Sequence, residues 1–295
     1  MDSYHKPVLL KEIIEALRVE TGKKYIDATL GGGGHAAEIL KRGGLVLGID
    51  ADEEAIRHVE ENIKYRENLI LVKENFKNIN QIAREKNFDK VSGIIFDLGL
   101  SSHQVDSVQR GFSYQRNAPL DMRMDESLKV KASDLVNVLT KGELYELFTK
   151  LGEERNARAI SSNIARARRI KPIETTEELS LIVQEAYGMG KNISPKDKAL
   201  TNKRVYQALR IAVNDELNNL KDALPKSLEL LESEGRLAVI TFHSLEDRIV
   251  KDAFNCFAEK ELGINITKKP ITPDFNEMMA NRRSKSAKLR VFEKN

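Results

Sequence analysis

Short apolar runs alternate with longer amphipathic stretches over the first third of the chain. The stretches carry apolar residues at helical spacing, and the runs cover residues 24–30 (KYIDATL), 45–50 (LVLGID), 69–74 (LILVKE) and 91–98 (VSGIIFDL). Continuous apolar strands separated by helices are typical of a parallel sheet that is covered on both faces. The pattern therefore predicts four parallel strands with helices between them.

The alternation stops after Leu98, and no strand is expected between residues 101 and 206, where the pattern is helical. Two capping boxes, Thr140 with Glu143 and Thr175 with Glu178, predict helix starts in this stretch. The helical pattern continues over residues 205–231, with a break expected at Pro225. The predicted order then closes with a strand at 236–242, a helix at 245–261 and strands at 264–268 and 288–292.

These elements predict an α/β fold, with a doubly wound, mostly parallel sheet interrupted by an all-helical insertion. We expect the sheet domain in residues 1–104 and 206–295, and the insertion in residues 105–205. Sheets of this kind bind ligands at the carboxyl ends of their strands. An insertion at that edge is therefore a candidate substrate-recognition domain.

The composition is that of an ordinary globular protein, with 48 basic and 45 acidic residues, a net charge of +3 and 41% hydrophobic residues. The one cysteine, Cys256, excludes an internal disulfide and a zinc site built from cysteines. No apolar run is long enough to span a membrane. We expect a soluble cytoplasmic protein without a membrane partner.

Four glycines, residues 31–34, follow the first predicted strand and precede a predicted helix that begins near His35. Glycine permits a sharp strand-to-helix turn and the close approach of a ligand to backbone amides. Asp50 ends the second strand, where a carboxylate can accept hydrogen bonds from both hydroxyls of a ribose. The pattern predicts a ligand that contains adenosine.

The spacing Gly31-x-Gly33-x-x-Ala36 also fits a loose dinucleotide fingerprint, so the glycines alone do not identify the ligand. Two carboxylates favour S-adenosylmethionine. Asp27 precedes the glycines and can reach a methionine ammonium group, and Asp97 ends the fourth strand, where adenine and the reacting centre would meet.

Seven motifs extend over almost the whole chain and carry a resemblance to one family. They are HKPVLL at 5–10, GGGGH at 31–35, DLGLSSHQVDSVQRGFSYQRNAPLDMRMD at 97–125, GEERNARAI at 152–160, YQALRIAVNDEL at 206–217, FHSLEDRIVK at 242–251 and SAKLR at 286–290. In this order they resemble the bacterial 16S ribosomal RNA cytosine-N4 methyltransferase family, RsmH or MraW.

The resemblance implies a class I S-adenosylmethionine-dependent methyltransferase domain with a helical insertion. It further implies methylation of the exocyclic N4 amine of a cytosine in the decoding region of 16S ribosomal RNA. The cofactor contacts that it implies are Gly33, Gly34, His35, Asp50, Phe76, Asp97 and Gln104.

A cytosine amine is a poor nucleophile because its lone pair is delocalised into the ring. Acceptors that hold its hydrogens out of the ring plane would localise that lone pair. We expect these acceptors to be Asp97, Ser101 or nearby backbone carbonyls. His243 follows the fifth strand, where it either contacts the base or takes the released proton, or else fills the turn before a capping box of Ser244 with Asp247.

The chemistry requires no metal, and the histidines show no ligand spacing. RNA binding is indicated by residues 155–171, which contain six basic residues and no acidic one. On a continuous helix, Arg155, Arg158, Arg166 and Arg169 lie on one side, so they either follow RNA phosphates or form a solvated face. The tail at 281–295 is a second basic segment.

Two aromatic residues, Phe112 and Tyr114, either stack on the target base or pack in the core. Two rival functions stay open at this point. One is an NAD-dependent oxidoreductase, and the other is a ribosome-assembly protein with a vestigial cofactor site. The expected partner is 16S ribosomal RNA, within a small-subunit particle, and the sequence does not show the oligomeric state.

Overall fold

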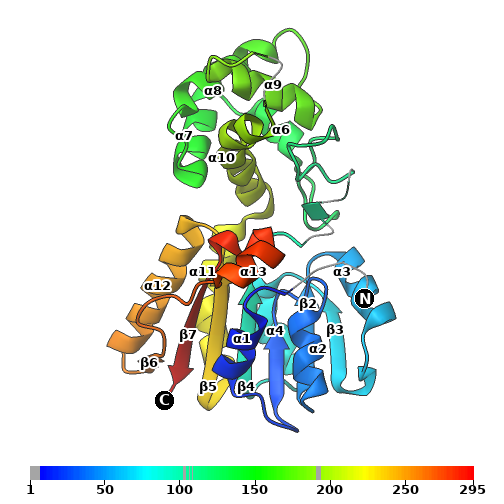
Figure 1. The fold of residues 1–295 in the computed structure, drawn as a ribbon, viewed down its shortest axis with the longest axis vertical. Helices are drawn as coiled ribbons and strands as arrows, with labels where there is room; N and C mark the ends of the chain where they lie inside the picture. The colour runs from blue at the N-terminus through cyan, green and yellow to red at the C-terminus, as the bar shows by residue number, and fades with distance from the viewer. Residues whose placement is uncertain (1–6, 102–103, 106, 108, 191–193) are drawn as a thin grey trace. The chain divides into compact units, whose positions relative to one another are not determined.

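A computed structural model describes residues 7–101, 104–105, 107, 109–190 and 194–295 (Figure 1). The chain divides into two units, one formed by Met1–Ser101 and Leu217–Asn295 and the other by Ser102–Glu216. We call them the sheet unit and the helical unit. The boundary that we expected at residue 205 falls inside helix α10 (Pro195–Asn214), so the second junction follows that helix.

The sheet unit contains a seven-stranded sheet in the order β3-β2-β1-β4-β5-β7-β6. Strands β1 to β5 run parallel, whereas β7 is antiparallel to both of its neighbours, β5 and β6. The strands are β1 (Lys24–Asp27), β2 (Leu45–Asp50), β3 (Leu69–Lys73), β4 (Val91–Asp97), β5 (Leu231–Thr241), β6 (Gly263–Asn265) and β7 (Lys288–Lys294). This arrangement confirms the predicted doubly wound, mostly parallel α/β fold.

Apolar residues alternate between the two faces of the sheet, and helices cover both. On one face, Ile94 and Phe96 of β4 belong to a core with α4 (Ile79–Glu85), α11 (Glu216–Leu230) and α12 (Ser244–Glu259). On the other face, Ile95 belongs to a core with α1 (Leu10–Leu17), α2 (Gly34–Lys41) and α3 (Glu53–Asn62). The remaining helices of this unit are α13 (Phe275–Ala280) and the short 3-10 turns η1 (Arg66–Asn68), η2 (Phe76–Asn78) and η3 (Arg282–Ser286).

The described part of the helical unit contains no strand, as expected, apart from one isolated bridge between Pro119 and Thr175. The capping boxes at Thr140 and Thr175 are both present. Besides α10, the helices of this unit whose full bounds are described are α6 (Ala132–Val138), α7 (Lys141–Gly152), α8 (Ala157–Ala167) and α9 (Thr176–Ala186). No helix among the described residues of either unit is long and apolar enough to cross a membrane.

The expected helix break at Pro225 is wrong, because α11 continues through it. Proline removes the hydrogen bond to the carbonyl four residues earlier, which here belongs to Lys221. Both residues are exposed, so water can satisfy that carbonyl. The long helical stretch is interrupted at Asp215 instead, whose φ of 51° lies in the left-handed region.

Candidate functional site

The glycine turn leads from β1 into α2. Gly31 and Gly33 have φ values of 50° and 73°, a conformation that side chains disfavour. Gly33 and Gly34 also have no room for a side chain, since an added Cβ would lie 2.9 Å from a carbon of Val59 or Pro7 respectively. The turn therefore requires glycine at these positions, and α2 begins without a side-chain cap.

Asp50, at the end of β2, holds the glycine turn in place. Its Oδ2 accepts a hydrogen bond from the Gly31 backbone N–H at 2.7 Å, and its Oδ1 accepts one from Asp52 at 2.9 Å. Burial raises the pKa of Asp50 to about 6, although these two hydrogen bonds oppose the shift. Each carboxylate oxygen has a second lone pair, so the group can still accept from a ligand.

Asp27, at the end of β1, is buried, with 1% of its surface exposed. Its Oδ1 accepts a hydrogen bond from the Thr29 backbone N–H at 3.3 Å, and no cation of the described chain pairs with it. Burial, together with the negative charges of Asp97 and Asp50, raises its pKa to about 7. This carboxyl group therefore suits a cationic ligand.

Asp97 ends β4, directly beside β1 and β5. Its backbone N–H donates to the Thr29 hydroxyl at 2.6 Å, which ties the ends of β4 and β1 together. Its Oδ2 lies 3.7 Å from Nδ1 of His35, and both side chains are largely buried. Asp27, Asp50 and Asp97 thus lie at the carboxyl ends of three adjacent parallel strands, where doubly wound sheets bind ligands.

His35 lies in the first turn of α2 and is 4% exposed. Its Nε2 is 3.1 Å from the Val8 carbonyl oxygen. Because a carbonyl only accepts, Nε2 carries the proton of this hydrogen bond and Nδ1 faces Asp97. The resemblance alone pointed to His35, and its position fits an orienting contact to Asp97.

Phe76 lies in η2, after β3, with its ring edge-on to Phe96 of β4 at a centroid distance of 5.4 Å. It is half-buried, so one part of its ring packs on the core. Ser101 is the last residue of the sheet unit, and Gln104 is a buried residue of the helical unit. The binding and catalytic roles expected for these three residues stay predictions.

His243 caps α12, and the expected capping box of Ser244 with Asp247 is wrong. The box consists of His243 and Glu246: His243 Nδ1 accepts from the Glu246 N–H at 3.4 Å, and Glu246 Oε2 accepts from the His243 N–H at 3.3 Å. Nε2 of His243 lies 3.1 Å from Glu246 Oε1. An imidazole nitrogen replaces the expected serine hydroxyl, and Asp247 instead pairs with Lys288 and Arg290.

The expected single arginine face does not form. Only Arg158 and Arg166 lie in α8, because Arg155 precedes the helix and Arg169 follows its end. Arg166 pairs with Glu185 of α9 at 2.7 Å. By contrast, Arg155, Arg158 and Arg169 are exposed, and their guanidinium groups form no hydrogen bond or ion pair within the described chain.

The two candidate stacking residues both pack within the helical unit. Phe112 is 7% exposed, with the Arg110 guanidinium 5.8 Å from its ring centroid. Tyr114 lies edge-on to Tyr206 at 5.4 Å. These contacts favour core packing over base stacking for both rings.

Sequence reasoning missed Thr29 and Glu246. Thr29 joins two strand ends through one hydroxyl, and its position in sequence carries no signal of that contact. The capping role of Glu246 could have been predicted. In a capping box, a carboxylate follows three residues after the polar residue that precedes the helix.

Comparison with known proteins gives a consistent result over the full length. The sequence pattern of the MraW methylase family matches residues 2–295. The chain is 45% identical to "Ribosomal RNA small subunit methyltransferase H" of Clostridium botulinum (strain Loch Maree / Type A3), covering 100% of both proteins. It is 41% identical to the protein of that name from Finegoldia magna, covering 100% of this chain and 99% of the relative. The chain therefore belongs to the MraW methylase family.

Proposed function

We propose that this protein transfers the methyl group of S-adenosylmethionine to the N4 amine of a cytosine in the decoding region of 16S ribosomal RNA. The observation that carries the proposal is the group of three carboxylates, Asp27, Asp50 and Asp97, beside a turn that only glycine can form. The names of the full-length relatives, small-subunit ribosomal RNA methyltransferases, supply the class of substrate.

The residues of this edge fit the cofactor. The buried carboxyl of Asp27 would bind the methionine ammonium, Asp50 would accept from the ribose hydroxyls, and Gly33 and Gly34 would form the tight turn beside the methionine part. Phe76 and Gln104 are assigned to the cofactor by the family resemblance. When bound, S-adenosylmethionine supplies an electrophilic methyl group on a sulfonium.

Asp97 is the proposed acceptor for a hydrogen of the target amine. It lies at the end of the central strand β4, where Thr29 fixes its backbone and Nδ1 of His35 lies 3.7 Å from its Oδ2. A carboxylate that accepts one amine hydrogen draws the nitrogen lone pair out of conjugation with the ring. Ser101 or a backbone carbonyl of the same loop would accept the second hydrogen.

We assign His243 to positioning. One of its ring nitrogens caps α12, and the other faces Glu246, so the imidazole is held at the carboxyl end of β5. In that place it can position the target base near Asp97, which pairs with Ile240 of β5. If His243 only positions, a His243→Asn variant should keep the wild-type pH profile of methyl transfer, and a changed profile would assign removal of the amine proton to His243.

The RNA would be bound in part by Arg155, Arg158 and Arg169, whose exposed guanidinium groups have no partner in the described chain. Arg166 would contribute less, because Glu185 neutralises it. We further propose that the substrate is a small-subunit particle, which places the reaction in the cytoplasm.

The decisive experiment uses small ribosomal subunits from a strain without this gene, purified protein and S-adenosylmethionine labelled in the methyl group. We expect label in one nucleoside, N4-methylcytidine, identified by mass spectrometry after digestion of the RNA. Free 16S RNA and complete subunits are assayed in parallel to identify the preferred substrate. Label in another nucleoside, or none, would overturn the proposal.

Two further arms address the rival functions and the metal. Binding of NADH without binding of S-adenosylmethionine would favour an oxidoreductase, and binding of subunits without methyl transfer would favour an assembly protein. Protein that has been treated with EDTA and returned to magnesium buffer should retain full activity. Activity that returns only with an added transition metal would contradict the proposed metal-free chemistry.

A further inference from the structure

A cavity lies in the sheet unit, away from the three carboxylates, beside the strands β7 and β6 at the far edge of the sheet. Its volume is about 260 Å³. Three elements line it: α12, β7, and β6 with the residues that follow it. The lining residues are Lys251, Phe254, Asn255, Asn265, Thr267, Lys268 and Arg290.

The lining is cationic and contains no carboxylate. Lys251 and Lys268 are exposed, and neither ammonium forms a hydrogen bond or an ion pair within the described chain. The cavity thus presents two positive charges that the described residues leave unneutralised. Such a site attracts an anion.

Arg290 is fixed in a defined orientation. Its Nε donates to Asp247 Oδ1 at 2.7 Å, which leaves its terminal nitrogens without a partner in the described chain. Burial alone would raise the pKa of Asp247, but the hydrogen bonds from Arg290 and Lys288 outweigh it and lower that pKa. A carboxylate that stays ionised thus positions an arginine whose terminal N–H groups suit a phosphate.

Two neutral side chains add donors. Thr267 Oγ1 accepts from the Val291 backbone N–H at 2.9 Å, so its hydroxyl hydrogen is available to donate. Asn255 Oδ1 accepts from the Asn265 amide at 3.2 Å, which orients the Asn255 Nδ2 group as a donor. Lys251 and Asn255 are four residues apart in α12 and therefore lie on the same side of that helix.

We propose that this cavity binds a backbone phosphate of the RNA substrate, at a nucleotide other than the target cytosine. The proposal rests on the function proposed above, which supplies an RNA as the partner. Three cationic side chains, a hydroxyl and an amide match the oxygens of a phosphodiester. The cavity extends the RNA contacts beyond the arginines of the helical unit onto the edge of the sheet.

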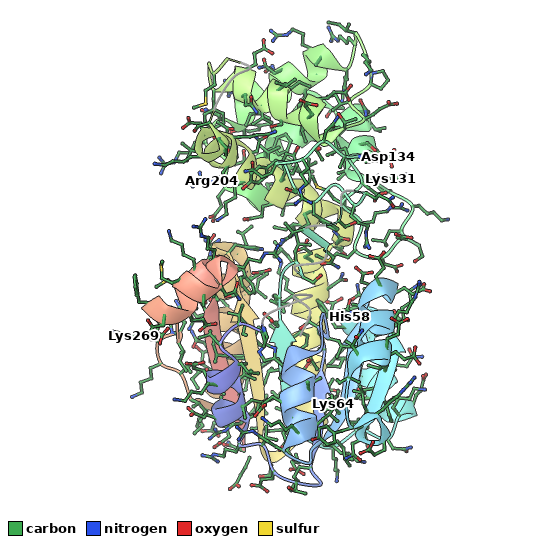
Figure 2. All side chains as sticks on the ribbon, turned by 45° about the vertical axis from the view of Figure 1, so that its right-hand side comes forward. His58, Lys64, Lys131, Asp134, Arg204 and Lys269 are labelled. Carbon is green, nitrogen blue, oxygen red and sulfur yellow. The ribbon has the colours of Figure 1, made fainter. Side chains whose placement is uncertain are left out.

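The test compares two double variants of the full-length protein that remove the same charge. Lys251→Gln with Lys268→Gln removes the two free lysines of the cavity. Lys260→Gln with Lys269→Gln is the matched control, since Lys260 ends α12 and Lys269 adjoins Lys268, and both are exposed but do not line the cavity. Figure 2 shows Lys269 at the outer surface of the sheet unit.

The measurement is the affinity for a 16S RNA transcript as a function of salt. The loss of one phosphate contact should lower the slope of log affinity against log salt by about 0.7 to 0.9. A fourfold rise in salt should then weaken binding by the cavity variant about threefold less than binding by the wild type. A slope for the cavity variant equal to that of the control variant would overturn the proposal.

Competition by inorganic phosphate at constant ionic strength distinguishes a phosphate of the RNA from a small phosphorylated ligand as the occupant of the cavity. It should compete with RNA on the wild type and the control variant but not on the cavity variant. If phosphate binds the wild type while the cavity variant retains full RNA affinity, the cavity takes a small phosphorylated ligand and the proposal is wrong. A change of oligomeric state in the cavity variant, seen by sedimentation, would instead make this edge an interface between copies of the chain.

Failure of this inference is distinguishable from failure of the proposed function. Methyl transfer by the wild type with an unchanged salt slope in the cavity variant rejects the phosphate site alone. RNA binding without methyl transfer by the wild type rejects the methyltransferase proposal and leaves the slope comparison valid.

Discussion

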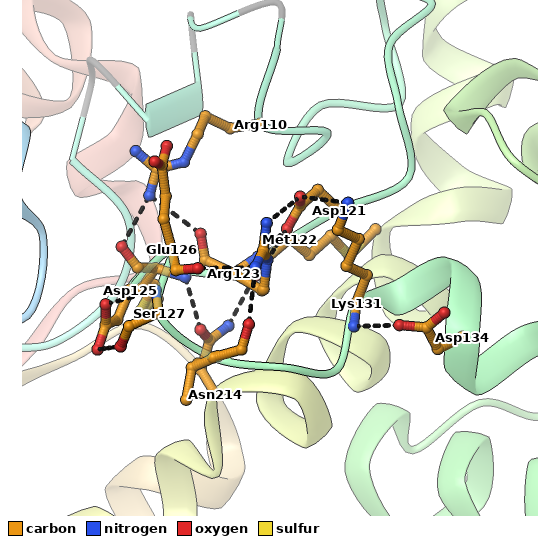
Figure 3. Close-up of polar contacts among 12 residues, drawn as sticks. Arg110, Asp121, Met122, Arg123, Asp125, Glu126, Ser127, Lys131, Asp134 and Asn214 are labelled. Atoms are coloured by element: carbon orange, nitrogen blue, oxygen red, sulfur yellow. Dashed lines mark hydrogen bonds and ion pairs between the residues drawn. The ribbon is translucent and has the colours of Figure 1, made fainter.

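Two aspartates, the buried Asp27 of the sheet unit and the half-buried Asp121 of the helical unit, differ in whether a cation of the protein pairs with them. The difference separates a charge that stabilises the fold from a charge that is kept for a ligand. Asp121, in the helical unit, forms a two-point ion pair with Arg123, with distances of 2.7 and 2.8 Å (Figure 3). Although burial opposes it, this pair lowers the pKa of Asp121. Asp27, in the sheet unit, has no such cation in the described chain, and its pKa is raised to about 7.

The loop around Asp121 is held by contacts within the helical unit. Arg110 donates to the carbonyls of Arg123 and Met124, and Asn214 bridges the backbone of Met122 and Met124 (Figure 3). These acceptors of Arg110, Arg123 and Asn214 all belong to the helical unit. Ionic groups that are satisfied within a unit thus maintain its fold, whereas a buried carboxyl group without a cation indicates a ligand that brings one.

The largest expected effect is at Asp97. Asp97→Ala should lower the rate of methyl transfer by at least about 100-fold, because it removes the proposed acceptor of the amine hydrogen. The fold should survive, since the bond to Thr29 uses the backbone N–H of residue 97. Single-turnover rates at saturating S-adenosylmethionine measure this effect. Turnover at the wild-type rate would exclude Asp97 from the mechanism.

Asp27→Asn tests in two ways whether the Asp27 carboxyl group is kept for a cationic ligand. The affinity of the wild type for S-adenosylmethionine should rise by at least about tenfold between pH 5.5 and pH 7, as the Asp27 carboxyl group ionises, and the variant should retain only the smaller dependence that comes from Asp50, whose pKa is raised to about 6. Calorimetry at several pH values measures it. A pH-independent wild type would show that the Asp27 carboxyl group does not bind the cation.

The same variant should stabilise the unliganded protein. A carboxyl with a pKa of about 7 when folded and 3.8 when unfolded costs stability as pH rises from 3.8 to 7, by about 4 kcal/mol in total. Asn removes that cost, so the melting temperature should rise at pH 8 and change little at pH 4. A variant that melts lower than the wild type at pH 8 would contradict the inferred charge imbalance.

Asp121→Asn tests whether Asp121 stabilises the helical unit. It should destabilise the unliganded protein, whereas Asp27→Asn should stabilise it. Loss of the pair leaves Arg123 without its carboxylate, although its bonds to the carbonyls of Glu126 and Leu128 persist. We expect a loss of about 1 to 3 kcal/mol of unfolding free energy at pH 7, shown by urea titration. Affinity for S-adenosylmethionine should stay at the wild-type value, and a matching loss of affinity would show that the two aspartates do not differ in role.

Asp50→Ala should weaken S-adenosylmethionine binding by about tenfold to a hundredfold. The variant removes the ribose acceptor and also releases the Gly31 amide that orders the turn. Asp52→Ala is the control, because Asp52 caps α3 through Glu54 and its loss should cost stability without affecting the affinity. Equal affinities for wild type and Asp50→Ala would remove Asp50 from the site.

Local patterns predicted the strands and the glycine turn, whereas contacts between distant segments were not predictable. Apolar runs gave β1 to β4 within a few residues, because burial on both faces requires such runs. The sequence did not show that β5 begins at Leu231, since residues 232–234 are polar and the pairing with β4 is irregular there. The pairing of Arg166 was not predictable for a similar reason, because its partner Glu185 lies in a different helix.

The smallest expected effect separates two arginines of one helix. Arg158 and Arg166 are both exposed in α8, but only Arg166 has an acidic partner, Glu185, at 2.7 Å. A free guanidinium that binds an RNA phosphate releases a counterion, whereas a paired one must first give up its carboxylate. Arg158→Gln should therefore lower the slope of log RNA affinity against log salt by about 0.7 to 0.9, and Arg166→Gln by clearly less. If the two variants lower the slope equally, pairing within the unit does not decide which charges bind RNA, and the distinction drawn from Asp27 and Asp121 does not extend to the cations.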